Sequence, residues 1–377
     1  MMLKKQFVIF SIVFVLAFSY GLSVGAYKIF PFDAISHAKE VILGNNAKPD
    51  QITINKFSYD ANVSSLIRIH SEQDITNKQN EIINYVWSGH GLPKSIMPQD
   101  VEEDISDSRY HDLTNLQRID KITYEMDYGI NSVSYVFIPK ESNNKVVIYH
   151  QGHDGDFYAG KDTIGYFVKN KYTVIAFSMP LLGMNSQPVI ETHDFGPIIL
   201  KSHNHLRYIE SNSTRPVKFF FEPIYVSLNY LEQKYKFDSY YMTGISGGAW
   251  VSMYYPTIDS RISQSYPVAG PLPLYLRSNY DTIGDYETEL PDLISIANEL
   301  EVYVMGAHGE NRKFIQIYNK YDPCCWAGTY FETYKQIVKD KVKELGAGTY
   351  DVYLDETNKS HTISENTLDV ISKSMNS

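Results

Sequence analysis

The feature that most constrains the fold is a regular alternation, from about residue 132 onward, of short apolar segments with longer helical ones. Segments such as 145–149 and 172–177 carry apolar residues at successive positions, which is typical of strands buried on both faces of a parallel sheet. The spacing of apolar residues predicts helices over 217–235, 293–305 and 330–345. Together they predict an α/β fold with a mostly parallel, doubly wound sheet. The other expected strands are 132–138, 240–244, 265–269, 314–318 and 350–354.

Two connections within this alternating part are too long to be simple crossovers. Residues 181–216 contain Pro188, Pro197 and several histidines, and residues 270–311 contain three prolines. Long insertions on compact domains usually carry function. We expect both segments to contribute to a cap over an active site.

Residues 1–30 are typical of an export segment. Lys4 and Lys5 precede residues 7–27, a run of 21 residues without a charge that is long enough to cross a bilayer. The run also fits a signal peptide, with Val-Gly-Ala at 24–26 as the cleavage site. The sequence leaves cleavage or retention as a transmembrane signal anchor open. In either case we expect the rest of the chain outside the cytoplasm, secreted, periplasmic or anchored to the membrane.

Residues 31–130 precede the alternating pattern and are mostly polar. A helix is predicted over 74–87 after an aspartate cap, whereas 97–115 is acidic and loop-like. We predict that this region is an N-terminal extension packed on a catalytic domain of residues 131–377, with a linker as the alternative.

The strongest chemical signal is the sequence Gly-Ile-Ser-Gly-Gly at 244–248. It lies directly between a strand-like and a helix-like segment. A G-x-S-x-G sequence in that position is typical of a nucleophile elbow, whose tight bend exposes the serine hydroxyl above the sheet. The N-terminus of the following helix then faces the negative charge that develops on a substrate. We therefore predict Ser246 as a catalytic nucleophile.

A serine nucleophile needs a base, and the base needs a third group to orient it. Asp322 follows the predicted strand 314–318, and His361 follows the last predicted strand. The chain order Ser, Asp, His is the one associated with a nucleophile elbow. Two rivals stay open. Asp355 also follows the last strand and could be the acid, and His308 is a base that is poorly placed in chain order.

The tetrahedral intermediate formed by such a serine needs two N–H donors. One is expected from the amide of Gly247, the residue after the nucleophile. The other is expected from the loop 150–155, with the sequence HQGHDG, which follows an early predicted strand. Gln151 and Gly152 are the candidates, and an ordinary glycine turn is the alternative.

The charge argues against a nucleic-acid-binding protein, and the cysteine content argues against a fold held together by disulfides. The net charge is −10 and no cluster of lysine and arginine is present, so we expect no nucleic-acid partner. The only cysteines, Cys324 and Cys325, are neighbours and cannot join distant parts of the chain, so the core must hold the fold. A structural role for them is favoured over a catalytic thiol.

Two pairs in the first insertion, His193 with Asp194 and His203 with His205, raise the question of a metal. No further matched ligands accompany them. We expect these histidines to face solvent or substrate, and we predict no metal site.

From about residue 132 to the C-terminus the sequence resembles the α/β-hydrolase superfamily, and within it the acetyl xylan esterase and dienelactone hydrolase-like branch. The residues that carry the resemblance are HQGHDG at 150–155, GISGGAW at 244–250, IDSRI at 258–262, YDP at 321–323 and SHTIS at 360–364. The resemblance implies acyl transfer from an ester to serine and then to water, with no metal or organic cofactor. The loop reads His-Gln-Gly-His where lipases have His-Gly-Gly-Gly, so the donating amide stays open.

The leading hypothesis is an exported serine hydrolase of carboxylic esters, acting on a small-molecule or carbohydrate ester, with acetylated carbohydrate as the candidate substrate. One alternative is a serine peptidase of the same fold, although about a hundred extra N-terminal residues are too few for the propeller that such enzymes often carry. The other is a membrane-anchored interaction protein that has lost its chemistry. The presence of serine, aspartate and histidine in the right order argues against it.

Overall fold

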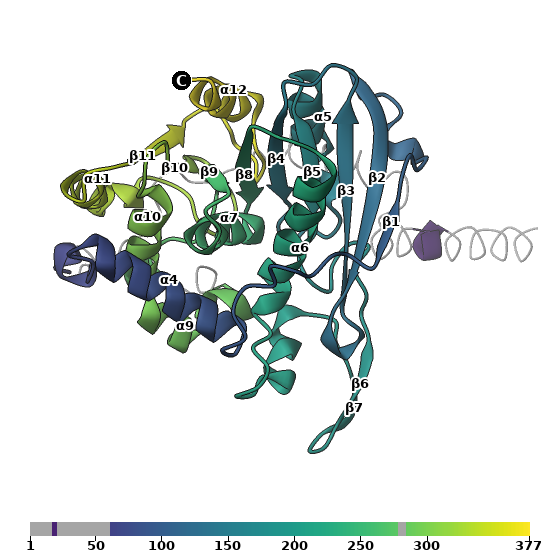
Figure 1. The fold of residues 1–377 in the computed structure, drawn as a ribbon, viewed down its shortest axis with the longest axis horizontal. Helices are drawn as coiled ribbons and strands as arrows, with labels where there is room; N and C mark the ends of the chain where they lie inside the picture. The colour runs from purple at the N-terminus through teal and green to yellow at the C-terminus, as the bar shows by residue number, and fades with distance from the viewer. Residues whose placement is uncertain (1–16, 21–60, 278–283) are drawn as a thin grey trace, which may run out of the picture. The chain divides into compact units, whose positions relative to one another are not determined.

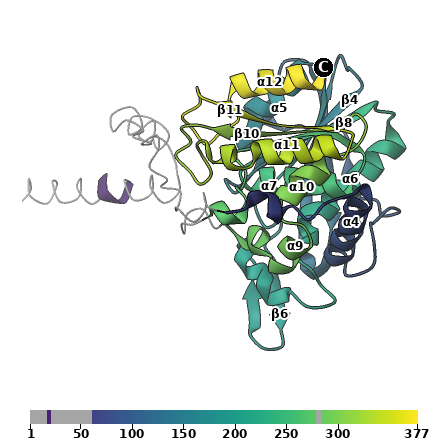
Figure 2. The ribbon, with the colours of Figure 1, turned by 90° about the vertical axis from the view of Figure 1, so that its left-hand side faces the viewer.

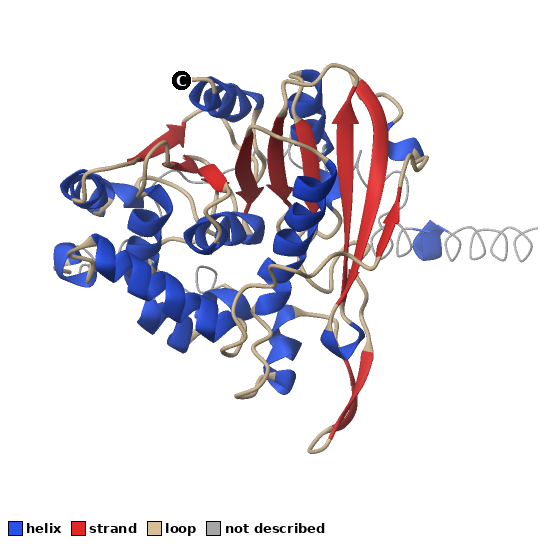
Figure 3. Cartoon of the chain, in the orientation of Figure 1, coloured by secondary structure: helices blue, strands red, loops and turns tan. Residues whose placement is uncertain are grey.

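The computed structural model of the chain describes residues 17–20, 61–277 and 284–377. Its centre is a nine-stranded sheet of order β1-β2-β3-β5-β4-β8-β9-β10-β11 (Figures 1 and 3). The six strands from β5 to β11 are parallel, and β1, β2 and β3 form an antiparallel edge. The strands are Asp100–Glu102 (β1), Leu116–Glu125 (β2), Asn131–Pro139 (β3), Lys145–His150 (β4), Thr173–Phe177 (β5), Ser239–Ile245 (β8), Ile262–Val268 (β9), Lys313–Asn319 (β10) and Thr349–Asp355 (β11). The predicted, mostly parallel sheet is confirmed.

Helices cover both faces of the sheet, which explains why its strands are apolar at successive positions. Two helices contribute buried residues to the core on one face, and the larger core on the other face includes residues of four helices that pack on the sheet (Figure 2). The first face carries α5 (Lys161–Lys169) and α12 (Glu365–Met375); the second carries α6 (Lys218–Lys234), α7 (Gly247–Ile258), α10 (Glu299–Ala307) and α11 (Lys335–Glu344).

One predicted helix is divided in two. The segment 293–305 belongs to α9 (Pro291–Ile296) and α10, because the Asn298 side chain accepts from the Glu301 N–H and Glu301 reaches back to the Asn298 N–H. This capping box starts a new helix. Since α10 packs against α7 and β10, it is the crossover helix between β9 and β10. The part of the cap candidate 270–311 that forms α10 therefore belongs to the helical layer on the sheet, and 278–283 lie outside the described residues.

The first insertion, residues 181–216, contains the hairpin of β6 (Val189–Thr192) and β7 (Gly196–Ile199), which extends away from the sheet (Figure 1). A 3-10 helix, His203–Ile209, follows it. This helix contacts a second 3-10 helix, Tyr286–Glu289, in the other insertion. The two cap candidates therefore meet each other.

Residues 61–130 are built into the same compact unit as the rest of the sheet. The helix α4 (Glu72–Val86) begins after Ser71, whose side chain accepts from the Asp74 N–H, so the cap is this serine and not the predicted aspartate. The α4 helix packs on α7 and α9, and the following Trp87 donates to the buried Glu222 at 2.8 Å. Because β1 pairs with β2 and β2 pairs with β3, the sheet continues across the boundary expected at residue 131.

Of the predicted signal peptide or anchor at residues 1–30, only 17–20 are described, and they are helical; the remainder lies outside the described residues. Within the described parts of the chain, no helix combines the length and the hydrophobicity that crossing a bilayer requires.

Candidate active site

Ser246 lies on a sharp bend between β8 and α7. Its backbone has φ 57° and ψ −120°, a conformation that is strained for a residue with a side chain. The flanking glycines are required by close packing. A Cβ on Gly244 would lie 2.3 Å from the Gly248 carbonyl oxygen, and one on Gly248 would lie 2.1 Å from the His150 carbonyl oxygen. The local geometry is that of a nucleophile elbow.

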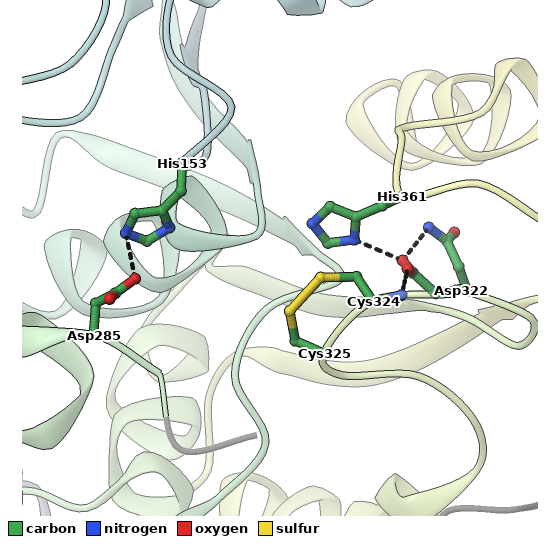
Figure 4. Close-up of a disulfide and its surroundings, with 7 residues drawn as sticks. His153, Asp285, Asp322, Cys324, Cys325 and His361 are labelled. Atoms are coloured by element: carbon green, nitrogen blue, oxygen red, sulfur yellow. Dashed lines mark hydrogen bonds and ion pairs between the residues drawn. A yellow bond between two sulfur atoms is a disulfide. The ribbon is translucent and has the colours of Figure 1, made fainter. Parts of the chain in front are cut away.

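Asp322 and His361 come together beyond the ends of β10 and β11, at the same edge of the sheet (Figure 4). His361 Nδ1 lies 2.9 Å from Asp322 Oδ2, and the aspartate side chain is fully buried. Asp322 also accepts from the Cys324 N–H at 2.9 Å and from Asn319 Nδ2 at 3.3 Å. His361 Nε2 is buried and has no hydrogen-bond partner among the described residues. This pair leaves one imidazole nitrogen available to take a proton.

Asp355, the alternative candidate for the acid, makes hydrogen bonds with residues other than His361. Its carboxylate accepts from the backbone and hydroxyl of Thr357, from the Asn358 N–H, and from the hydroxyls of Ser364 and Thr367. Burial would raise the pKa of Asp355, but the hydrogen bonds from Ser364 and Thr357 outweigh it and lower the pKa to about 2. These bonds hold the two ends of the loop that carries His361, and no hydrogen bond joins Asp355 to His361 itself in the described structure.

The loop after β4 lies directly against the elbow. A Cβ on Gly152 would lie 2.8 Å from both Ser246 Cβ and the Ile245 carbonyl oxygen, so only glycine fits there. The Gln151 N–H donates to the Phe177 carbonyl at 2.9 Å and belongs to the sheet. The Gly152 N–H makes no hydrogen bond within the described chain. Of the two amides predicted from this loop, Gln151 is engaged elsewhere and Gly152 remains a candidate beside Gly247.

The neighbouring histidines of this loop differ from each other. His150 is buried and stacked on Phe177, and its Nδ1 lies 2.9 Å from the Gln151 carbonyl. Burial lowers the pKa of His150 to about 4, so it is neutral at physiological pH. His153 instead lies beside Gly247, where a Cβ would come within 2.4 Å of its Cε1.

Four side chains form what we call the histidine cluster: His153, His203, Asp285 and Glu287. They come from the loop after β4 and from both insertions. Glu287 Oε2 lies 3.0 Å from His203 Nδ1, and Glu287 Oε1 lies 3.1 Å from His153 Nε2. Burial would raise the pKa of Glu287, but the two imidazoles outweigh it and keep the carboxylate ionised.

The expectation that the histidines of the first insertion face solvent or substrate is wrong for His203, which is 3% exposed. It holds for His193, which is exposed and paired with Asp194 at 2.7 Å. No periodic or local signal in the sequence links His203 with Glu287, since both lie on short 3-10 helices in irregular insertions.

Two further features of the site were not foreseen. Asn319, the last residue of β10, donates to Asp322 and to the Thr362 carbonyl at 3.0 Å, and so connects the acid with the loop that carries His361. Cys324 and Cys325 are bonded to each other beside Asp322 (Figure 4). As expected for neighbours, this disulfide joins no distant parts of the chain.

Among the predicted catalytic residues, Asp322 and His361 are in direct contact, and Gly152 packs on Ser246. No hydrogen bond joins the Ser246 hydroxyl to His361 in the described structure. Catalytic hydrogen bonds are often longer in the absence of substrate. The bend at Ser246, the Asp322–His361 pair and the loop of Gly152 all follow parallel strands of the same sheet.

Comparison with known proteins supports the fold. No protein-family model and no curated protein matches the sequence. Among solved structures, an acetyl xylan esterase from Paenibacillus sp. R4 has a TM-score of 0.53 at 12% identity, covering 83% of this chain and 98% of that one. Acetyl xylan esterase 1 from Thermoanaerobacterium sp. JW/SL YS485 has a TM-score of 0.51 at 13% identity, covering 80% and 92%. The methylesterase BT1017 has a TM-score of 0.54 at 14% identity, covering 83% and 67%. The chain has the α/β-hydrolase fold.

Proposed function

We propose that this chain is a serine hydrolase of carboxylic esters, with Ser246 as nucleophile, His361 as base and Asp322 as acid. One observation carries the proposal. The Asp322–His361 contact of 2.9 Å leaves His361 Nε2 buried and unpartnered at the edge of the sheet where Ser246 occupies its strained bend. A neutral imidazole held in this tautomer can accept the proton of an attacking hydroxyl.

In the first half of the reaction, Ser246 Oγ attacks the ester carbonyl and His361 Nε2 takes the hydroxyl proton. The amides of Gly247 and Gly152 donate to the oxyanion that forms. The alcohol then leaves with the proton from His361, and the acyl group stays on the serine. In the second half, His361 takes a proton from water as the water attacks the acyl-enzyme, and then gives that proton to Ser246 Oγ as the bond to the acyl group breaks and the acid leaves. Asp322 stabilises the imidazolium in both halves.

The substrate class follows from two further considerations. The similar solved structures include acetyl xylan esterases and a methylesterase, which favours short acyl or methyl esters. The charge-free run at residues 7–27 favours export or anchoring. We propose an ester of carbohydrate as the substrate, encountered outside the cytoplasm, with acetylated glycan as the first choice.

The test is labelling of the full chain, purified in mild detergent, with a fluorophosphonate probe, alongside Ser246→Ala. We expect labelling of the wild type alone, because only an activated hydroxyl reacts with the probe. Acetate release from acetylated glycans, compared with hydrolysis of long-chain lipid esters, then tests the substrate. Equal labelling of both proteins, or of neither, contradicts the serine mechanism. Turnover of lipid esters alone contradicts the carbohydrate assignment.

A further inference from the structure

The histidine cluster presents more acceptor atoms than it has protons to satisfy them. His203 Nε2 lies 3.0 Å from the Pro180 carbonyl, which can only accept, so this nitrogen carries a hydrogen. In a neutral ring the lone pair is then on Nδ1. That lone pair faces Glu287 Oε2 at 3.0 Å and His153 Nε2 at 3.1 Å. Glu287 Oε2 and His153 Nε2 thus both approach His203 Nδ1, a nitrogen that carries one hydrogen at most.

His153 Nε2 has the same difficulty. It lies 3.1 Å from each of His203 Nδ1, Glu287 Oε1 and Asp285 Oδ2, yet it can donate one hydrogen at most (Figure 4 shows the contact with Asp285). Glu287 Oε1 is buried and accepts no hydrogen bond from the described residues, although His153 Nε2 is so near. A buried carboxylate oxygen without a donor costs free energy unless a cation compensates it.

We propose that His153, His203 and Glu287 bind a divalent metal ion that prefers imidazole, of the Zn²⁺ type, with Asp285 or water as the fourth ligand. The ligand atoms of the first three residues all lie within 4.8 Å of one another. Ligands roughly 2.0–2.2 Å from a tetrahedral ion lie roughly 3.3–3.5 Å apart, so a small outward movement of these side chains accommodates the ion. A site of two imidazoles and one carboxylate suits Zn²⁺ better than Mg²⁺ or Ca²⁺, because the latter two prefer oxygen ligands only.

The surroundings of the cluster match those of metal ligands. The Pro180 carbonyl accepts from His203 and fixes the tautomer that exposes the Nδ1 lone pair, as outer partners of ligating histidines do. Burial increases from the outer to the inner ligands. The Asp285 side chain is 43% exposed, that of His153 is 30% exposed, and those of His203 and Glu287 are 2% and 0% exposed. An ion would therefore have a solvent-facing side and a closed side.

The bound ion would join three separate parts of the chain. It would link both insertions to the loop after β4, two residues from Gln151 and one from Gly152. With Nε2 on the metal, the proton of a neutral His153 ring is on Nδ1, and this atom lies beside Gly247, where a Cβ would come within 2.6 Å of it. The ion thus sets the position and the tautomer of a ring that packs against the elbow. Metal binding itself does not depend on the proposed function.

The competing arrangement is an ion pair between a protonated His203 and Glu287, with no metal. It supplies a proton to Glu287 Oε2, and a neutral His153 that carries its hydrogen on Nε2, 3.1 Å from Glu287 Oε1, is the donor it offers to the other oxygen. It also predicts that stability is insensitive to added metal. The metal site and the metal-free ion pair therefore differ in the amount of bound metal and in the change of stability on adding metal. Both predict that removing one of these side chains lowers the stability.

The experiment uses the full chain in mild detergent, stripped with a chelator and then given Zn²⁺ or Mg²⁺. Bound metal is measured by elemental analysis after gel filtration, affinity by competition with a chromogenic chelator, and Tm with and without metal. We expect one Zn²⁺ per chain, a higher Tm with Zn²⁺ and no such response to Mg²⁺. In His153→Ala and Glu287→Gln we expect affinity for Zn²⁺ to fall about a hundredfold or more.

His193→Ala is the matched control, since it removes an imidazole from an exposed histidine–carboxylate pair in the same insertion. Its Zn²⁺ content and its Tm response should equal those of the wild type. The proposal is overturned if the wild type retains no Zn²⁺, if its Tm does not respond to Zn²⁺, or if the cluster variants bind Zn²⁺ as tightly as the control. The change of Tm upon adding metal is compared within each variant, so a variant that is merely less stable does not imitate the expected result. Fluorophosphonate labelling of the same samples reports separately on the proposed function.

Discussion

The Asp322–His361 pair and the histidine cluster both place imidazole against a buried carboxylate, but they differ in the supply of donors. Asp322 accepts from a side-chain amide, a backbone N–H and one imidazole, and the spare atom is a nitrogen, His361 Nε2. In the cluster the spare atom is a carboxylate oxygen, Glu287 Oε1. An imidazole nitrogen without a partner, next to a carboxylate that accepts several hydrogen bonds, suits a base that takes up a proton. A carboxylate oxygen without a donor, next to two imidazoles, suits a bound cation. Both sites combine histidine with a carboxylate, and what distinguishes them is which atom has no hydrogen-bond partner.

The largest expected difference between the two sites is in how far substitutions lower turnover. His361→Ala and Asp322→Asn should each lower kcat for a chromogenic acetate ester by about 10⁴, because the first removes the base and the second favours the wrong tautomer of it. His153→Ala removes a ring that packs against the elbow but takes no part in the proposed proton transfer, so we expect a smaller loss. Initial-rate kinetics of the three variants and the wild type measure the difference.

The rival base provides the control for this comparison. His308 lies near Glu72, with 3.9 Å between His308 Nε2 and Glu72 Oε1, so His308→Ala should leave turnover close to that of the wild type. If His308→Ala lost as much turnover as His361→Ala, or if His361→Ala stayed within tenfold of the wild type, the assignment of the base would be wrong.

A second comparison, between Asp322 and Asp355, concerns stability. Asp355 accepts five hydrogen bonds from the following loop and the start of α12, so Asp355→Asn should cost about 2 kcal/mol in the free energy of unfolding, and more than Asp322→Asn. Turnover should fall only ten- to a hundredfold, roughly, because His361 is displaced and not removed. Chemical denaturation and kinetics on the same samples give both values. A larger loss of turnover in Asp355→Asn than in Asp322→Asn would reverse the two roles.

The pH dependence sharpens the same prediction. The pKa of Asp355 is lowered from 3.8 to about 2, so its stabilising contribution is complete above pH 3.8 and is lost as the pH falls towards 2. Over that window the wild type should lose about 2 kcal/mol more stability than Asp355→Asn does. If unfolding of the two proteins showed the same pH dependence between 4 and 2, the hydrogen bonds to Asp355 would contribute nothing.

The sequence indicates that Asp322 and His361 lie close together but does not indicate that His203 and Glu287 do, for a physical reason. Asp322 and His361 follow parallel strands whose carboxyl ends meet at one edge, so locating the strands locates these residues. The strand pattern likewise predicts all seven strands from β3 onward in the main sheet. His203 and Glu287 are 84 residues apart on 3-10 helices with no period to read, and only packing brings them together. The contacts of Asn319 cannot be predicted from the sequence, because a polar residue at a strand end has many possible partners.

The smallest expected effect concerns the disulfide beside the catalytic acid. A bond between neighbouring residues closes a ring that constrains the unfolded chain very little, so Cys324→Ser with Cys325→Ser should change stability by about 1 kcal/mol or less. The contact of this segment with Asp322 comes from the backbone N–H of residue 324, which serine retains. Turnover should therefore stay close to that of the wild type, both in the double variant and in the wild type treated with a reductant. A large loss of turnover in both would mean that the bonded pair, and not the backbone alone, holds Asp322 against His361.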